Sequence, residues 1–309
     1  MKKIAFPQGK KFAFTIFDDT DHASVENVKP VYELLVRLNM RTTKSIWVFP
    51  TDNERNPYFH SQTLADPDYL SFIRWLMENG FEVAFHNASM DSNPREVTLA
   101  ALERFKELLG RYPNVHVNHS RNKDNLYWGQ DRIDFPPIRL LMKLKRRSTD
   151  FVGHRPESPF YWGDLCRQHI TYVRNFVFRE INLLRINPTM PYRDPKRPHV
   201  QYWFSSSEGG SAKSFNALLS ADNQRRLEGE GGVCIVYTHF AKGFVEDGKV
   251  NNETEQLLHQ LSMRQGWFVT VTELLDYLRA EQTSAALTTS ERIRMELRWF
   301  IGKLLHGTS

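Results

Sequence analysis

Short apolar runs alternate with amphipathic segments along most of this 309-residue chain, and this alternation constrains the fold more than any other feature. Seven runs have the length and composition of strands, and they cover residues 12–17, 45–49, 81–85, 115–117, 201–204, 233–238 and 267–271. Residues 172–178 and 181–186 are expected to be extended or core segments. Several segments between the runs have helical spacing of apolar residues, and Asp66-Pro67 is typical of a helix start. Strands that alternate with helices predict a largely parallel sheet or barrel. The Ser- and Gly-rich residues 205–211 are expected to form a loop.

Composition and charge exclude several classes of protein. No stretch approaches about 18 uncharged apolar residues, so no transmembrane helix is expected. The first residues are basic but no long apolar run follows, so we expect no signal peptide and a cytoplasmic protein. The net charge of +5 is mild and its basic clusters are local, so we expect no nucleic-acid partner. Cys166 and Cys234 form no CxxC pair, and we expect both to be buried, reduced thiols.

The end of the chain is predicted to be separate from the rest. Residues 1–281 are expected to form the main domain, and residues 282–309 a linker followed by a helix. Residues 290–305 have apolar residues at helical spacing with basic residues between them. Two interpretations are open: the helix docks on the main domain, or it lies on an anionic membrane as a peripheral contact at the inner membrane.

Ionisable residues follow four of the predicted strands. Asp18 and Asp19 follow the first strand, and His86, His119 and His239 follow three others. A pair of acids after a strand is also common in turns. Sites of α/β barrels lie at the carboxyl ends of the strands, so residues from four strand ends indicate a site. Carboxylate and imidazole together suit Zn²⁺ or a similar divalent ion.

Three segments resemble motifs of the polysaccharide deacetylases, the NodB-homology or carbohydrate esterase 4 family. They are Thr15-Ile16-Phe17-Asp18-Asp19, Gly80-Phe81-Glu82-Val83-Ala84-Phe85-His86-Asn87 and Val233-Cys234-Ile235-Val236-Tyr237-Thr238-His239. Their order and spacing fit the family, and the resemblance covers residues 12–278. Further phrases are similar to the WbmS-like branch, which is associated with bacterial O-antigen gene clusters: Asp18-Asp19-Thr20-Asp21, Asn118-His119-Ser120, Asn125-Leu126-Tyr127-Trp128-Gly129 and Tyr161-Trp162-Gly163-Asp164. The resemblance implies a single distorted (β/α) barrel of about seven strands, NodB-like, with a C-terminal amphipathic helix.

The resemblance also implies roles for the residues at the strand ends. Asp18 would be the general base, Asp19 and His86 would bind a divalent metal, with Zn²⁺ preferred, and His239 would be the general acid. In such a site the base removes a proton from a metal-bound water, and the acid protonates the leaving amine.

The chain departs from the family pattern at two points. The family usually has a second histidine four residues after the first, where this chain has Met90, a poor ligand for Zn²⁺. His119 and Asp91 are both candidates for the third metal ligand, and His119 is preferred. An arginine should orient the base and favour its ionised form, and Arg155 and Arg121 are both candidates, with Arg155 preferred.

These features together predict a metal-dependent hydrolase that removes an N-acyl group, acetyl by preference, from a sugar. The resemblance places it in bacterial surface polysaccharide (O-antigen or lipopolysaccharide) biosynthesis, with a nucleotide- or lipid-linked sugar as substrate. Tyr127, Trp128 and Trp162 are candidates for stacking on the sugar, and ordinary core packing is their alternative. Arg132 and Arg155 are candidates for contact with a diphosphate. Two other functions stay open: a catalytically impaired sugar-binding protein on a deacetylase scaffold, and a hydrolase of a ring or imide bond.

Overall fold

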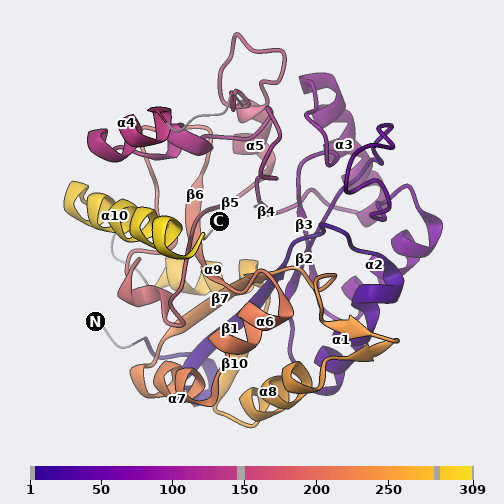
Figure 1. Cartoon of the computed structure of the whole chain (residues 1–309), viewed down its shortest axis with the longest axis vertical. Coiled ribbons are helices and arrows are strands. Elements are labelled where there is room, and N and C mark those ends of the chain that lie inside the picture. The colour runs from indigo at the N-terminus through magenta and orange to yellow at the C-terminus, as the bar shows by residue number, and fades with distance from the viewer. Residues whose placement is uncertain (1–3, 145–149, 282–285, 308–309) are drawn as a thin grey trace.

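The structure is a computed structural model that describes residues 4–144, 150–281 and 286–307 (Figure 1). Its strands are β1 (Phe12–Asp18), β2 (Thr43–Ile46), β3 (Glu82–Phe85), β4 (Val115–His116), β5 (Tyr172–Phe178), β6 (Tyr202–Glu208), β7 (Val233–Thr238), β8 (Val245–Glu246), β9 (Lys249–Val250) and β10 (Gly266–Phe268). Its α-helices are α1 (Val25–Arg37), α2 (Pro67–Glu78), α3 (Arg95–Leu109), α4 (Pro136–Leu144), α5 (Gly163–His169), α6 (Ala212–Leu218), α7 (Ala221–Glu230), α8 (Asn252–Ser262), α9 (Val271–Ala280) and α10 (Thr289–His306). Three 3₁₀ turns complete it: η1 (Pro7–Gly9), η2 (Gly129–Arg132) and η3 (Leu183–Arg185).

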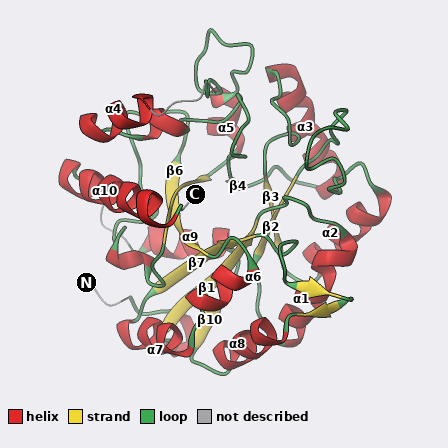
Figure 2. Cartoon of the chain, viewed as in Figure 1, coloured by secondary structure: helices red, strands yellow, loops and turns green. Residues whose placement is uncertain are grey.

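The strands β1 to β7 form a closed parallel barrel in chain order. β7 pairs back onto β1 over six residues, from Ala13↔Val233 to Asp18↔Thr238, and β10 adds a parallel strand beside the start of β1. The helices surround the barrel (Figure 2). Every residue of β1 and of β7 is buried, as expected for parallel strands that helices cover on their outer face. The expected barrel of about seven strands is confirmed.

The helix boundaries follow local sequence signals. Ser24 caps α1 in a reciprocal capping box with Asn27. Asp66 precedes α2 and Pro67 is its first residue, as predicted. α3 ends at Gly110, which has a φ of 79° that a residue with a Cβ rarely adopts.

The predicted loop at residues 205–211 is partly wrong, because β6 continues to Glu208. The three serines of β6 are fully buried between neighbouring strands. The Ser207 hydroxyl donates to the carbonyl of Glu180 (2.6 Å), and Ser205 accepts from the Asn187 side chain (3.1 Å). Serine-rich composition is typical of a loop. Here β6 pairs with β5 and β7, and this pairing and the two hydrogen bonds keep the serines in the barrel wall.

The helix α10 packs against the barrel beside β5. The connection from β5 to β6, which is described throughout, contains η3 but no α-helix. Trp299 of α10 is 1% exposed, and its ring lies 5.5 Å from that of Phe176. The buried Glu296 carboxylate accepts the backbone N–H groups of Asp134 and Phe135, each at 2.8 Å. One face of α10 therefore docks on the barrel, in line with the first interpretation of this helix. The predicted linker begins at residues 282–285, outside the described residues.

Two expectations from composition can be compared with the structure. Cys166 and Cys234 are both free and buried, as predicted. Among the described residues, none of the helices has the length and apolar character required to cross a bilayer.

Candidate active site

Polar residues gather at the carboxyl end of the barrel. β1 ends at Asp18, β3 delivers His86 and β7 delivers His239. His119 follows the short strand β4 by three residues. Since all these strands run in parallel, their carboxyl ends share one rim, and the structure brings these side chains together there.

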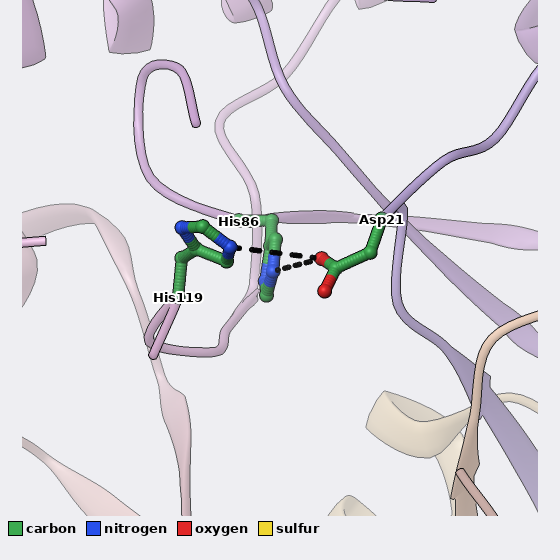
Figure 3. Close-up of side chains that lie close together, drawn as sticks. All are labelled: Asp21, His86 and His119. Carbon is green, nitrogen blue, oxygen red and sulfur yellow. Dashed lines mark ion pairs between the residues drawn. The ribbon is translucent and has the colours of Figure 1, made fainter. Parts of the chain in front are cut away.

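A buried cluster of Asp21, His86 and His119 has the composition of a metal site (Figure 3). The Asp21 Oδ1 atom lies 3.4 Å from the His86 Nε2 and 3.9 Å from the His119 Nε2. One ligand atom from each residue lies within 4.8 Å of the others. One carboxylate and two imidazoles are a donor set that suits a catalytic divalent cation with positions left open.

The hydrogen bonds around this cluster leave its inward-facing atoms without partners. The Asn122 amide nitrogen donates to the Ser89 carbonyl, so its Oδ1 accepts from the His119 Nδ1–H at 2.9 Å. The neutral His119 ring then presents a lone pair on Nε2, and burial lowers its pKa and favours this neutral form. The Nε2 atoms of both histidines and Asp21 Oδ1 are buried with no hydrogen-bond partner in the described structure. Unpartnered acceptors that converge in a buried space are costly, and a bound cation would satisfy them.

Asp19 forms a bidentate ion pair with Arg174 of β5. The Asp19 oxygens lie 3.0 and 2.6 Å from the two terminal nitrogens of Arg174, and both side chains are buried. Burial alone would raise the pKa of Asp19, but the guanidinium charge outweighs it and lowers the pKa. Sequence reasoning missed Arg174. Its signal was a single arginine inside the otherwise nearly apolar run of β5, where a buried charge needs an acid.

Asp18 lies in a separate buried ion pair with Lys44 of β2. The two residues are register partners in the sheet, their Oδ2 and Nζ atoms are 3.0 Å apart, and both side chains are fully buried. The Asp18 carboxylate also accepts from the Tyr32 hydroxyl (3.0 Å) and the Phe240 N–H (2.8 Å). Burial raises the pKa of Asp18; it would lower that of Lys44, but attraction to Asp18 raises it and keeps the amine protonated. The Asp18 oxygens are therefore occupied and shielded from solvent.

His239 lies on the other side of Asp21 from the two clustered histidines. Its Nδ1–H donates to the Gly210 carbonyl at 2.8 Å, which leaves Nε2 directed at Asp21 Oδ2, 3.3 Å away. The Lys242 amine lies 3.8 Å from the same oxygen. Burial would raise the pKa of Asp21, but the His239 and His86 imidazoles close to its carboxylate outweigh it, and the pKa lies well below its ordinary value.

Asp91, the alternative metal ligand, and the candidate arginines Arg155 and Arg121 do not have the contacts that their predicted roles require. The Asp91 carboxylate accepts from the Thr51 hydroxyl and from the Asn56 amide, at 2.8 Å for the amide. Arg155 pairs with Asp131 at 3.2 Å and not with an acid of β1. Arg121 is exposed. The arginine that pairs with an acid directly after β1 is Arg174.

The three predicted sugar-stacking residues are mostly held in packing contacts. Trp162 is fully buried, and its Nε1–H donates to the Asp124 carbonyl at 2.6 Å, so it cannot line an open substrate site. Tyr127 is 7% exposed and its ring lies 4.2 Å from that of His154. Trp128 is half-buried and lies against the guanidinium of the buried Arg132, 4.2 Å from its ring centroid. Trp162 and Tyr127 are therefore held in packing contacts, and Trp128 keeps a partly exposed ring.

Comparisons with known proteins support the fold at low sequence identity. No family model and no curated protein matches the chain. Solved structures do match: a candidate polysaccharide deacetylase from Mycobacterium smegmatis is 14% identical, with a TM-score of 0.53, 93% of this chain covered and 97% of that one. The allantoinase Puue is 13% identical, with a TM-score of 0.51 and coverage of 89% and 92%. A candidate polysaccharide deacetylase from Pseudomonas aeruginosa PAO1 is 12% identical, with a TM-score of 0.51 and coverage of 90% and 94%. At these identities the likeness establishes a shared barrel fold.

Proposed function

We propose that this protein is a metal-dependent hydrolase that removes an N-acyl group from a sugar. The observation that carries the proposal is the buried cluster of Asp21, His86 and His119, whose facing atoms have no other partner. The cluster lies beside Asp19, which is paired with Arg174, and beside His239, which follows β7. The motif resemblance and the shared fold with candidate polysaccharide deacetylases support amide hydrolysis on a carbohydrate.

In this proposal Asp21, not Asp19, supplies the carboxylate that holds the metal together with His86 and His119. Both oxygens of Asp19 are taken by Arg174, whereas Asp21 Oδ1 is unpartnered. A divalent cation bound there would polarise the substrate carbonyl and lower the pKa of a bound water. Asn122 fixes the tautomer of His119 that binding requires.

Asp19 is the proposed general base in place of Asp18. Arg174 keeps the Asp19 carboxylate ionised and in one orientation, as a base that accepts a proton from water requires. The Asp18 side chain has no exposed surface and lies inside the barrel against Lys44, Tyr32 and a backbone N–H, whereas the Asp19 side chain is 5% exposed. We assign Asp18 a structural role because a fully buried carboxylate cannot meet a substrate water.

His239 is the proposed general acid for the leaving amine. The Gly210 carbonyl holds the proton on Nδ1, so Nε2 is the atom that takes up a proton and donates it at the site.

The proposed substrate is an N-acetylated sugar on a nucleotide or lipid carrier, from the synthesis of bacterial surface polysaccharide. Tyr58 supports a sugar subsite at the rim: it is half-buried, and its ring lies 5.2 Å from His119 and 4.7 Å from the exposed His22. Aromatic faces beside a polar site suit the apolar face of a sugar ring.

Metal content and acetate release together test the proposal. The purified protein should hold a stoichiometric divalent ion that a chelator removes, and should release acetate from N-acetylated sugars such as UDP-N-acetylglucosamine. Asp21→Asn should lose the ion and Asp19→Asn should keep it but lose about 10²- to 10⁴-fold in rate. Asp91→Asn is the matched control, since its carboxylate is bonded to Thr51 and Asn56, and should keep both metal and rate.

Two results would redirect the proposal. Protein that never binds a divalent ion but binds sugars would be a sugar-binding protein on this scaffold. Because the allantoinase Puue shares the fold, allantoin belongs in the substrate panel, and turnover of it alone would identify a ring hydrolase.

A further inference from the structure

The outer surface of α4 and α10 gathers most of the exposed apolar side chains. Nine large apolar side chains are exposed in the described part of the chain, and six of them lie on these two helices. The six are Leu140 (59%), Leu141 (45%), Leu297 (38%), Ile301 (52%), Leu304 (54%) and Leu305 (69%). The two helices lie on one side of the barrel in Figure 1, and Glu296 of α10 accepts the N–H groups of the two residues just before α4. A concentration of this kind marks an interaction surface.

The charged side chains on this α4–α10 surface have one sign. On α10 the exposed charged side chains in the described residues are Arg294, Arg298 and Lys303, of which Lys303 turns its amine toward the buried Trp299 ring, 5.4 Å from the ring centroid. Arg139 of α4 is exposed, 57% for its side chain, and lies 3.9 Å from the largely buried Asp131 carboxylate. The two acids of α10 are engaged: Glu296 is buried against Arg292, and the half-buried Glu291 accepts from the Thr288 hydroxyl of the helix cap and lies near Arg294.

The free end of α10 lies at the rim of the barrel that carries the site. Its C-cap residue Gly307 lines a cavity of about 310 Å³ together with Arg179, Glu208 and Ser214. Arg179 directly follows β5 and Glu208 ends β6, so this cavity is at the carboxyl ends of the strands. Leu304 and Leu305, which are exposed beside it, would bring that rim close to any surface that they enter.

We infer that the α4–α10 surface docks on a bilayer that contains anionic lipids. Exposed Leu and Ile would enter the headgroup boundary while the neighbouring Arg and Lys side chains meet lipid phosphates, as in interfacial amphipathic helices. The buried face of α10 stays on the barrel through Trp299, so docking needs no unfolding. The barrel would then present its site next to the membrane, which favours a sugar carried on a lipid over one carried on a soluble nucleotide. Docking itself does not depend on the proposed reaction, whereas this choice of substrate does.

Self-association through the same surface is disfavoured by its charge. A two-fold interface places the same patch of each copy opposite itself. The basic patch of one copy, which includes Arg294 and Arg298, would face the basic patch of the other, with no exposed acid on the described part of either helix to offset the charge. An anionic bilayer offers the opposite charge, so it is the occupant that the chemistry favours.

Co-sedimentation of the full chain with vesicles tests the inference. The protein should bind vesicles of phosphatidylcholine with phosphatidylglycerol, and much less to phosphatidylcholine alone or at high salt. Replacing Arg294 by Gln should weaken binding about fivefold. Leu304→Ser with Leu305→Ser should weaken it at least about tenfold.

Matched controls separate docking from loss of folding or of activity. Met263→Ser removes an equally exposed apolar side chain after α8 (77% exposed), and Lys249→Gln removes an exposed cation on β9, and neither should change binding. Each variant should keep the wild-type melting temperature. Absence of binding to anionic vesicles, or binding that the Leu304 and Leu305 changes leave intact, would overturn the inference. A dimer in size-exclusion chromatography that the same changes dissociate would assign the surface to self-association instead. Vesicle binding requires no turnover, so its failure is distinct from failure of the proposed reaction.

Discussion

Replacement of Lys44 by Met should strongly destabilise the protein, because it leaves the buried Asp18 carboxylate without its cation. Both side chains are fully buried and their charged atoms are 3.0 Å apart. Removal of one partner of a buried ion pair costs about 3–5 kcal/mol. The Tyr32 hydroxyl and the Phe240 N–H still bond to Asp18, so we expect a loss of about 3 kcal/mol, the lower end of that range.

This loss corresponds to a measurable change in melting temperature. With an unfolding entropy of about 2.1 cal/mol/K per residue, a chain of 309 residues has about 0.65 kcal/mol/K. A loss of about 3–5 kcal/mol therefore lowers the melting temperature by about 5–8 °C. Lys29→Met is the matched control: Lys29 pairs with Glu33 on the surface, each side chain is 46% exposed, and the expected change is under about 1 kcal/mol.

The double variant Lys44→Met with Asp18→Asn separates a structural role from a catalytic one. It removes both charges. The new amide oxygen can accept the Phe240 N–H while its NH2 group donates to the Tyr32 hydroxyl, which turns to accept, so most of the lost stability should return. Because Asp18 is assigned to the barrel wall, acetate release by the double variant should stay within about tenfold of wild type, against the 10²- to 10⁴-fold or so expected for loss of a general base. Recovered stability with lost turnover would refute the structural assignment and restore Asp18 as the base. A double variant as unstable as the single one would refute the account of the pair.

Three further changes test other parts of the structure. Arg174→Lys cannot make the bidentate pair with Asp19, so turnover should fall by about 10- to 100-fold while bound metal is retained. Trp299→Ala removes the buried ring that docks α10 and should cost about 3–5 kcal/mol in the free energy of unfolding. His154 accepts the backbone N–H of Tyr127 on its Nδ1. Burial, together with the charge of Arg155, lowers the pKa of His154 from 6.5 to about 4, although the charge of Asp131 acts to raise it. The unfolded chain therefore binds a proton that the folded chain does not, and stability should fall as pH drops from about 6.5 to about 4, by up to about 1.4 kcal/mol per pH unit. His154→Asn, measured by denaturant unfolding across this range, should have a flatter profile.

Each of these predictions has an outcome that contradicts it. Wild-type turnover in Arg174→Lys would show that the base needs no arginine. Stability of Trp299→Ala no lower than that of Leu297→Ala, a change at an exposed position of the same helix, would show that α10 is not held by its buried face. Equal pH slopes in wild type and His154→Asn would place the acid sensitivity in other groups.

The sequence by itself indicated a largely parallel sheet or barrel and the strand ends at which the site lies, and the motif resemblance added the closed barrel. Runs such as residues 233–238 are long enough only for a buried strand, and the change from apolar to ionisable residues at their ends is local. In a parallel barrel every strand ends at the same rim, so strand-end residues such as His86 and His239 meet there whatever the loops do.

Only the tertiary structure decided what each acid near β1 contacts. Asp18, Asp19 and Asp21 lie within four residues of sequence, yet they face Lys44, Arg174 and the histidine cluster. Successive strand residues point to opposite sides, and the turn after β1 redirects Asp21. The cations come from β2 and β5, so their positions depend on strand register and on closure of the barrel. The residues next to the acids in sequence do not determine those contacts. In the same way, the sequence does not show which face of α10 is exposed, because that depends on the packing of Trp299 against Phe176 of β5.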